Sequence, residues 1–408
     1  MSLAAEVGRK GADVRSDCWF RITPTTSGGI QLQLNSKVKT MYGSAIETLI
    51  RHGLKFFQID HAMVEFEDSG ALPFTIMARL ETAVRRLGLD QGRQWLPEFK
   101  AFCQYPTSRE RFRRSRLYLP GNEPKFMINA GIHKPDGIIL DLEDSVAPTE
   151  KDAAQTLVRN ALLQIDFYGA ERMVRINQLP RGLDDLGFVV PYNVHVILIP
   201  KCESAEHVKM VEQRVHSILN DRGLEQQVYY MPIIESALGA IRAFEIATAS
   251  PDIVALTIGL EDYTADIGTQ RTLEGRESFW ARSQVVNAAR AAGIQPIDTV
   301  FSDVTDMEGL RQSVLEAKSL GFDGKGCIHP RQIQVIHEAF APTPEEIERA
   351  TKIVLAFESA QKSGLGVVAL GSKMIDPPVV KRAQRTIRLA IETGKLAENW
   401  RQGGEQHG

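Results

Sequence analysis

The sequence predicts a (β/α)₈ TIM barrel, with a small α+β domain before it and a helical extension after it. Two observations predict the barrel. From residue 115 onward, eight short apolar runs suited to strands alternate with amphipathic stretches suited to helices, over roughly 230 residues. Polar and charged residues also follow most of these apolar runs directly. Strand–helix alternation of this length is typical of such a barrel, whose site lies at the carboxyl ends of the strands.

Composition narrows the class of protein. The chain has 408 residues, 43% of them hydrophobic, which is enough for two or three domains. Its net charge of −3 comes with no extended basic patch, which argues against a nucleic-acid partner. No apolar run reaches the ~18 residues needed to span a membrane. The four cysteines (Cys18, Cys103, Cys202 and Cys327) show no paired spacing. We therefore expect a soluble, reduced, cytoplasmic protein without a cysteine metal site.

The first 92 residues predict a small domain of their own. Alternating polar and apolar residues predict strands, and helical spacing predicts two helices, in the order ββαβα. The strands are expected at 17–24, 29–36 and 54–65, and the helices at 39–52 and 73–86. The alternation indicates a sheet with one solvated face. A linker at 93–112, which contains Pro97 and Pro106, leads into the barrel domain at 113–342.

The barrel strands are expected in eight motifs. They are "SRLYLP", "GIILDLED", "RMVRIN", "VHVILIPK", "YYMPIIE", "IVALTIGLED", "IQPIDTVF" and "GFDGKGCIHP", with helices at 205–220, 237–249, 279–293 and 307–319 among those that separate them. Polar residues close these strands: Asp141, Glu143, Asp144, Arg175, Asn177, Lys201, Glu235, Glu261, Asp262, Asp298 and His329. A single one of them could serve as a helix cap, but a ring of them favours a chemical site.

Glu235 and Asp262 are the strongest candidates in this ring. They lie 27 residues apart, about one strand–helix repeat, so they belong to neighbouring strands. Two adjacent carboxylates repel each other unless a cation lies between them. Oxygen ligands without a nearby His or Cys favour Mg²⁺. Arg175 offers a planar fork that suits a carboxylate, so a metal opposite an arginine predicts a site for a small α-keto or α-hydroxy acid.

The barrel motifs resemble a known family. "RRSRLYLPGN", "GIILDLEDSVAPTEKDAA", "VRIN", "LIPKCES", "PIIESALG", "IGLEDYTADIG", "GCIHPRQI" and "GSKMIDPP" together resemble the citrate lyase beta subunit group of the HpcH/HpaI aldolase family. The resemblance implies a Mg²⁺-dependent lyase that cleaves a β-hydroxyacyl thioester into an acyl thioester and an α-keto acid. By position, Glu235 and Asp262 match the metal ligands, and Arg175 matches the keto-acid binder. Arg114, Glu143 and Asp144, in the matching motifs, are assigned to substrate binding.

The first 90 residues resemble the citrate lyase acyl carrier (gamma) subunit, through "SDCWFRITP", "IQLQLNSKVKTMYGSAI" and "DSGALPFTIMARLETAVRR". The carrier has a serine that bears its prosthetic group, two residues before an Asp. Here Arg15 stands at that position, followed by Ser16. Ser16 would carry the group only with a one-residue slip. The alternative is a domain that has kept the carrier fold for packing or docking.

The extension at 343–408 carries one more candidate. The stretch "GLGVVALGSKMIDPPVVKRAQ" follows a helix expected at 343–362, and it is surplus to the barrel. The resemblance assigns Asp376 as a general acid/base on a lid that reaches a neighbouring subunit's site, which implies a homotrimer. The alternative is that Asp376 only caps a helix that begins near Val379.

Three interpretations of the function remain open at this point. The first is a Schiff-base aldolase with Lys201 as its nucleophile, since this lysine closes the fourth strand. The acyl thioester is bound either to CoA or to a carrier, and the barrel residues are the same in both cases. Finally, the chain could be a non-catalytic scaffold of a citrate-lyase-like complex. The expected partners are an acyl thioester, a keto acid, CoA and further copies of the chain.

Overall fold

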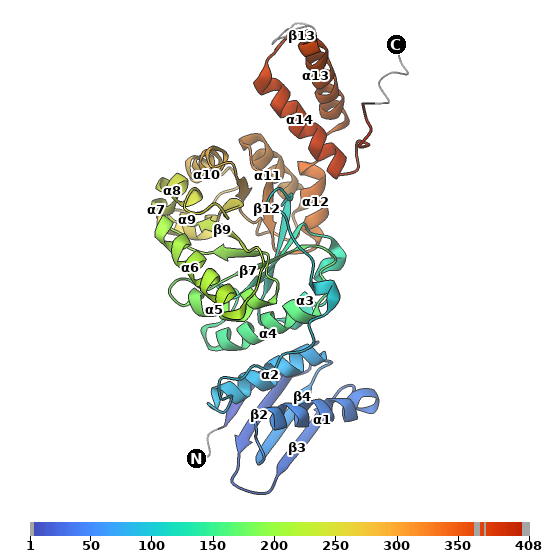
Figure 1. Cartoon of the computed structure of the whole chain (residues 1–408), viewed down its shortest axis with the longest axis vertical. Coiled ribbons are helices and arrows are strands. Elements are labelled where there is room, and N and C mark those ends of the chain that lie inside the picture. The colour runs from blue at the N-terminus through green and yellow to red at the C-terminus, as the bar shows by residue number, and fades with distance from the viewer. Residues whose placement is uncertain (1–3, 363–367, 371–372, 402–408) are drawn as a thin grey trace. The chain divides into compact units, whose positions relative to one another are not determined.

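The computed structural model describes residues 4–362, 368–370 and 373–401 (Figure 1). The chain divides into two compact units, Met1–Ile333 and Gln334–Gly408. No helix among the described residues is long and apolar enough to span a membrane. The four cysteines are free and buried.

The N-terminal domain is a mixed four-stranded sheet with two helices. The strands are β1 (Ala5–Gly8), β2 (Cys18–Pro24), β3 (Ile30–Ser36) and β4 (Ala62–Asp68), in the spatial order β1-β2-β4-β3. Strand β3 is parallel to β4, and the other pairs are antiparallel. Helices α1 (Lys39–Phe56) and α2 (Pro73–Arg86) contact each other and the sheet. Buried and partly exposed residues alternate along β4, so one sheet face is solvated as expected.

Two features of this domain differ from the sequence prediction. Strand β1 was not foreseen, because its four residues are too short to show a pattern. The strand expected at 54–65 is wrong in its first half, since α1 continues to Phe56 and β4 begins at Ala62. The reason is a helical spacing: Ile46, Ile50 and Leu54 are four residues apart and all buried.

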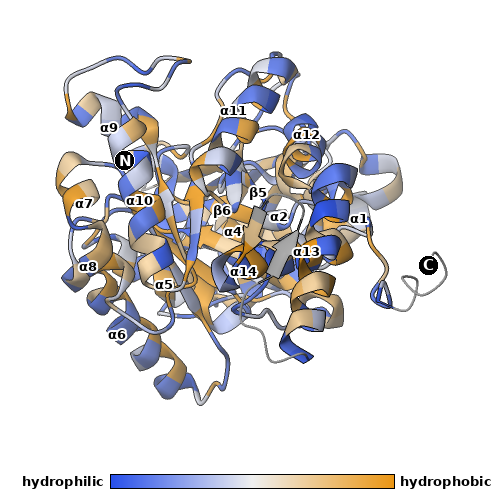
Figure 2. Ribbon diagram, turned by 90° about the horizontal axis from the view of Figure 1, so that it is seen from above, coloured by the Kyte–Doolittle hydropathy of each residue, from blue (hydrophilic) through white to orange (hydrophobic). Residues whose placement is uncertain are grey.

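The barrel is closed by eight parallel strands, as predicted (Figure 1). They are β5 (Ser115–Pro120), β6 (Gly137–Asp141), β7 (Glu171–Arg175), β8 (Val196–Ile199), β9 (Tyr229–Ile234), β10 (Ala255–Ile258), β11 (Gln295–Asp298) and β12 (Gly324–Cys327). Apolar side chains such as Ile139, Val196 and Ile297 fill the interior, and hydrophobic residues lie at the centre of this unit in Figure 2. The barrel is therefore a packed core rather than a pore.

Helices surround the barrel. They are α3 (Pro124–Met127), α4 (Lys151–Gln164), α5 (Gly182–Val189), α6 (Ala205–Arg222), α7 (Ala237–Ile241), α8 (Ala243–Ala247), α9 (Leu260–Asp266), α10 (Phe279–Ala291) and α11 (Met307–Leu320). Helix α12 (Arg331–Phe340) begins in this unit and continues into the second. The helix expected at 237–249 is interrupted at Arg242, whose backbone leaves the helical region with ψ of 10°. Short 3₁₀ turns occur at Ala101–Cys103, Ala130–His133, Pro148–Glu150 and Val190–Tyr192.

The second unit consists mainly of two packed helices. They are α13 (Pro344–Lys362) and α14 (Pro377–Glu392), with a two-stranded ribbon, β13 (Val368–Leu370) and β14 (Lys373–Ile375). Apolar residues of both helices, including Val354, Phe357 and Ile387, form a separate core. Gly364, Gly366 and Gly371, which belong to the stretch assigned as a lid, lie outside the described residues.

A buried interface joins the N-terminal domain to the barrel through α2 and α4. The guanidinium of Arg159 donates to both carboxylate oxygens of Glu81, at 2.6 and 2.8 Å, and both side chains are fully buried. The hydroxyls of Thr82 and Thr156 lie 2.6 Å apart at the same interface. Buried charges of this kind require their partner, so the two domains are held in one arrangement.

Breaking this pair should destabilise the protein. We expect Glu81→Ala to cost about 3–5 kcal/mol, because it leaves a buried guanidinium without its counter-charge. The shift of the guanidinium-chloride unfolding midpoint measures the effect. Glu47→Ala is the control, since it removes an exposed Arg51 partner at 2.9 Å and should cost at most about 0.5 kcal/mol. Equal shifts for the two variants would contradict the prediction that the buried pair contributes more stability than the exposed one.

Candidate functional site

A pocket of about 340 Å³ opens among the carboxyl ends of the barrel strands. Its walls include Asp141, Asp144, Arg175, Glu235 and Asp262, which were all named from the sequence. The volume suits a small organic acid, at the lower end of the range for ligand sites. The structure thus brings together most of the predicted ring of polar residues.

Arg175 and Asp141 face each other at the ends of two neighbouring strands, β7 and β6. Nε and Nη2 of Arg175 donate to the two carboxylate oxygens of Asp141, both at 2.7 Å. Burial would raise the Asp141 pKa, but the hydrogen bonds and charge of Arg175 hold it below its usual value. Only the Nη1 edge of the guanidinium points elsewhere, to Glu143 at 3.0 Å and Asp144 at 3.5 Å.

The pKa values of Glu143 and Asp144 are shifted in opposite directions. Burial works to raise the pKa of Glu143, but hydrogen bonds, including those from Gln178 and Lys201, together with the charge of Arg175 lower it to about 2. Burial and the adjacent Glu143 raise the pKa of Asp144 to about 6. Asp144 is half-exposed and lines the pocket, whereas Glu143 is buried beside it. Glu143 is therefore a fixed anion, and Asp144 is a carboxyl that titrates near neutral pH.

Glu235 follows β9 and is buried at the pocket wall. Its Oε2 accepts a hydrogen bond from the backbone N–H of Lys201 at 2.9 Å. The other oxygen lies against Gly259, where a Cβ would come within 2.5 Å of Oε1. The glycine therefore makes room for this carboxylate. Burial raises the Glu235 pKa to about 7, and the charge of Asp262 adds to the increase.

Asp262 does not lie at a strand end as expected. Strand β10 ends at Ile258, and Glu261 and Asp262 lie in the first turn of α9, which begins after Gly259. Carboxylates are favourable there because the helix N-terminus carries partial positive charge. Asp262 reaches the pocket, where its Oδ1 lies 3.4 Å from the ammonium of Lys201. Glu261 pairs instead with Arg271.

Lys201 is held among these acids. Its ammonium donates to Glu143 at 3.0 Å and lies 3.6 Å from Asp144. Burial would lower the Lys201 pKa, but the hydrogen bond and charge of Glu143, with Asp144 and Asp262, raise it well above its usual value. A lysine that forms a Schiff base needs the opposite shift, so this environment argues against that interpretation.

Arg114 does not reach the pocket, contrary to the sequence prediction. It lies before the amino end of β5, where its guanidinium pairs with Asp136 at 2.8 Å. Arg116, two residues further along the strand, lines the pocket instead and is fully buried. Its Nη2 donates to Thr257 at 3.1 Å, and its Nε has no hydrogen-bond partner among the described residues. Arg116 is a charged residue within an otherwise largely apolar strand, and this feature of the sequence could have marked it as a site residue.

Asp298 and His329 are the strand-end candidates with the weakest case for chemistry. Asp298 is fully buried, and it accepts from Lys325 at 2.7 Å and from Arg282 at 3.1 Å. These two cations lower its pKa against the effect of burial, so it is a charge-paired structural anion, although it lines the pocket. The ring of His329 accepts from the backbone N–H of Arg331 at 3.1 Å, and His329 is not part of the pocket wall.

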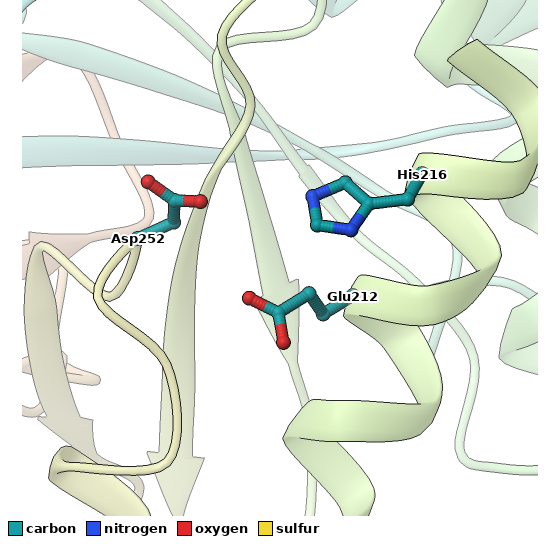
Figure 3. A group of neighbouring side chains, drawn as sticks. All are labelled: Glu212, His216 and Asp252. Atoms are coloured by element: carbon teal, nitrogen blue, oxygen red, sulfur yellow. The ribbon is translucent and has the colours of Figure 1, made fainter. Parts of the chain in front are cut away.

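A second group of possible ligands lies away from the pocket (Figure 3). Glu212 and His216, one turn apart on α6, and Asp252 bring ligand atoms within 4.8 Å of one another. Ser250 donates to Glu212, and Gln227 donates to Asp252 at 2.9 Å. None of the three lines the pocket, so this surface cluster is separate from the site.

The two remaining candidates lie outside the pocket wall. Asp376 caps α14 by accepting from the N–H of Val379 at 3.2 Å, and Pro377 begins that helix. Ser16 has a left-handed φ of 57°, and its N–H donates to Ser69 at 3.0 Å. Its neighbour Asp17 is buried and forms two hydrogen bonds with Arg79.

The buried Glu235 gives a pH-dependent prediction for stability in the presence of a chelator. Its pKa is raised from 4.5 to about 7, so the folded state binds this proton more tightly than the unfolded state. The contribution of Glu235 to the free energy of unfolding therefore falls as the pH rises from about 4.5 to 7. Glu235→Gln should stabilise the protein by about 3 kcal/mol at pH 8, and the gain should vanish near pH 4.5. Melting curves across this range measure it, and a constant gain would contradict the raised pKa.

Comparison with known proteins identifies relatives of both domains. The model of the HpcH/HpaI aldolase/citrate lyase family matches residues 114–330. The model of the malonate decarboxylase delta subunit (MdcD) matches residues 9–87. Citrate lyase subunit beta of Leuconostoc mesenteroides subsp. cremoris is 41% identical over 284 residues, which cover 69% of this chain and 94% of that protein. Human mitochondrial citramalyl-CoA lyase is 34% identical over 290 residues, which cover 68% and 85%.

A solved structure matches as well. Protein CitE from Mycobacterium tuberculosis, in complex with magnesium, acetoacetate and coenzyme A, superposes with a TM-score of 0.57. It is 30% identical, and the match covers 69% of this chain and 99% of that chain. The family match spans the barrel strands that build the pocket. This chain belongs to the HpcH/HpaI aldolase/citrate lyase family.

Proposed function

We propose that this chain is a Mg²⁺-dependent carbon–carbon lyase. It cleaves a β-hydroxyacyl thioester, of the citryl, malyl or citramalyl type, into an acyl thioester and an α-keto acid. The observation that carries the proposal is the pocket itself, where Glu235 and Asp262 share the wall with Arg175 and Arg116. The names of the relatives, citrate lyase subunit beta and citramalyl-CoA lyase, support the same reaction class.

Glu235 and Asp262 suit a magnesium ion. Both offer carboxylate oxygens to the same pocket, and the absence of a side chain at Gly259 leaves room beside Glu235. Burial raises the pKa of Glu235, and a divalent cation beside it would stabilise the charged carboxylate. When bound, Mg²⁺ supplies Lewis-acid polarisation of the substrate's carbonyl and carboxylate oxygens. Two protein ligands leave positions for substrate and water.

Arg175 and its neighbours would bind and orient the keto-acid portion. Because Asp141 occupies the Nε–Nη2 edge of Arg175, the substrate carboxylate would meet the Nη1 edge in place of Glu143 or Asp144. Arg116 adds a second buried cation deeper in the pocket. Asp144, with a pKa of about 6, would donate to or accept from the substrate at the mouth. Arg114 has no part in this proposal.

The thioester is proposed to be a CoA thioester rather than one carried on this chain. Arg15 occupies the position that bears the prosthetic group in the carrier family, and Ser16 is only a displaced substitute. The buried Glu81–Arg159 pair fixes the N-terminal domain on the barrel, which favours a packing role. Carriage of the group by Ser16 remains the alternative that mass spectrometry decides.

A homotrimer with shared sites is the proposed assembly. Large apolar side chains are exposed on three helices that contact one another, α7, α8 and α10, and Figure 2 shows these helices side by side. The residues are Leu238, Ile241, Phe244, Phe279 and Trp280. Exposed apolar patches commonly mark interfaces, so this one supports association between copies. Asp376 is proposed as the general acid/base that a neighbouring copy contributes, in addition to its role as a helix cap.

A panel of thioesters tests the reaction. The purified chain, shown by intact mass to carry no group on Ser16, should cleave citryl-, malyl- or citramalyl-CoA only with Mg²⁺. Asp262→Asn should remove both Mg²⁺ binding and turnover, since it weakens one of two protein ligands. Circular dichroism serves as the control for folding, because Asp262 lies at the rim rather than in the barrel core. No turnover of any thioester by folded, Mg²⁺-bound protein would favour a scaffold subunit.

Mixing of inactive subunits tests the shared site. Asp376→Asn should lower turnover by roughly 10²–10⁴ with little change in Mg²⁺ affinity, as expected for loss of a proton-transfer group. Co-assembly of Asp376→Asn with Glu235→Ala subunits should restore part of the activity, since some sites then combine two intact halves. Mixed oligomers without recovery would mean that Asp376 acts within its own chain or only caps α14.

A further inference from the structure

Lys201 contacts both carboxylates of the proposed metal site and two further acids beside them. Its backbone N–H holds Glu235 at 2.9 Å, and its ammonium lies 3.4 Å from Asp262. The same ammonium lies 3.0 Å from Glu143 and 3.6 Å from Asp144. One residue, at the end of β8, therefore links acids that come from β6, β9 and α9.

The backbone of Lys201 is adapted to this double task. Its φ is 46°, in the left-handed region that side chains other than glycine rarely adopt. This conformation accompanies an N–H that points to Glu235 and a side chain that reaches Glu143 and Asp262. Unusual backbone conformations of this kind persist where surrounding contacts impose them, most often at functional sites.

We propose that Lys201 is the resident cation of this site, a positioning residue that neutralises Asp262 until a divalent cation replaces it. This inference rests on the proposed metal site at Glu235 and Asp262. The carboxylate of Asp262 cannot form a full ion pair with Lys201 and coordinate a metal ion at the same time. Lys201 therefore competes with the metal, and its contact with Glu143, the shortest of its ammonium contacts, keeps it in place after Asp262 leaves.

Two electrostatic effects of Lys201 on metal binding have the same sign. Its ammonium must give up Asp262, and its positive charge repels a second cation nearby. Both effects weaken Mg²⁺ binding. In the metal-free protein, however, the ammonium offsets repulsion among Glu143, Asp144, Asp262 and Glu235. Lys201 should thus lower the affinity for Mg²⁺ while it keeps the metal-free site ordered.

Titration calorimetry with Mg²⁺ alone tests the proposal on the full-length chain. Lys201→Met should bind Mg²⁺ about tenfold or more tightly than wild type, because the competing charge is gone. Lys201→Gly should do the same, and it suits the left-handed backbone, so it guards against misfolding of the first variant. Lys209→Met, which removes an exposed lysine of α6, is the matched control and should leave the affinity unchanged.

Melting temperatures give a second readout. Without metal, Lys201→Met should melt below wild type, and saturating Mg²⁺ should raise its melting temperature by more than that of wild type. Unchanged or weaker Mg²⁺ affinity in both folded Lys201 variants would overturn the proposal. If Asp262→Asn still abolishes Mg²⁺ binding in that case, the metal site stands and only the role of Lys201 fails. Wild-type protein that binds no Mg²⁺ would overturn both.

Discussion

Repulsion among carboxylates is the constraint on which the barrel mouth depends. Asp141, Glu143, Asp144, Glu235 and Asp262 all reach the carboxyl ends of the strands, and water is partly excluded there. Arg175 and Lys201 compensate part of this charge. Arg175 pairs with Asp141 through two short hydrogen bonds and also contacts Glu143, and the Lys201 ammonium contacts Glu143, Asp144 and Asp262. Glu235 receives only a backbone N–H, and its pKa of about 7 reflects this deficit. The least compensated acid is thus the one best placed to favour a metal ion.

One acid at the strand ends has its charge compensated by two buried cations. Asp298 lies between Lys325 and Arg282, all three buried, and their hydrogen bonds leave no role for a replaceable ion. Lys201 and Asp262, by contrast, are partly exposed, and their contact is long, at 3.4 Å. Short, buried ion pairs resist replacement by another ion, whereas long, solvent-exposed ion pairs are replaced more easily. This difference separates structural charge pairs from those that function can rearrange.

Sequence reasoning predicted the fold well, for reasons that particular residues illustrate. The buried barrel strands are continuous apolar runs, and "YYMPII" coincides with β9. The acids of the site follow such runs, so Glu235 and Asp262 were visible. Their partners were not, because the pairing of Asp141 with Arg175 or of Lys201 with Asp262 depends on contacts distant in sequence. Arg114 and Arg116 show the same limit. They differ by two positions, and only barrel geometry decides which one reaches the pocket.

The N-terminal domain matches the MdcD family model and packs against the barrel. A carrier that delivers a tethered group must move relative to its enzyme, and mobility requires an interface that is small or easily wetted. Here α2 is buried along most of its length, and Glu81, Thr82 and Phe74 all bond to α4. An arginine at the attachment position and a buried charged interface point in the same direction. Both support the proposal that this domain has a packing role and that the substrate is a CoA thioester.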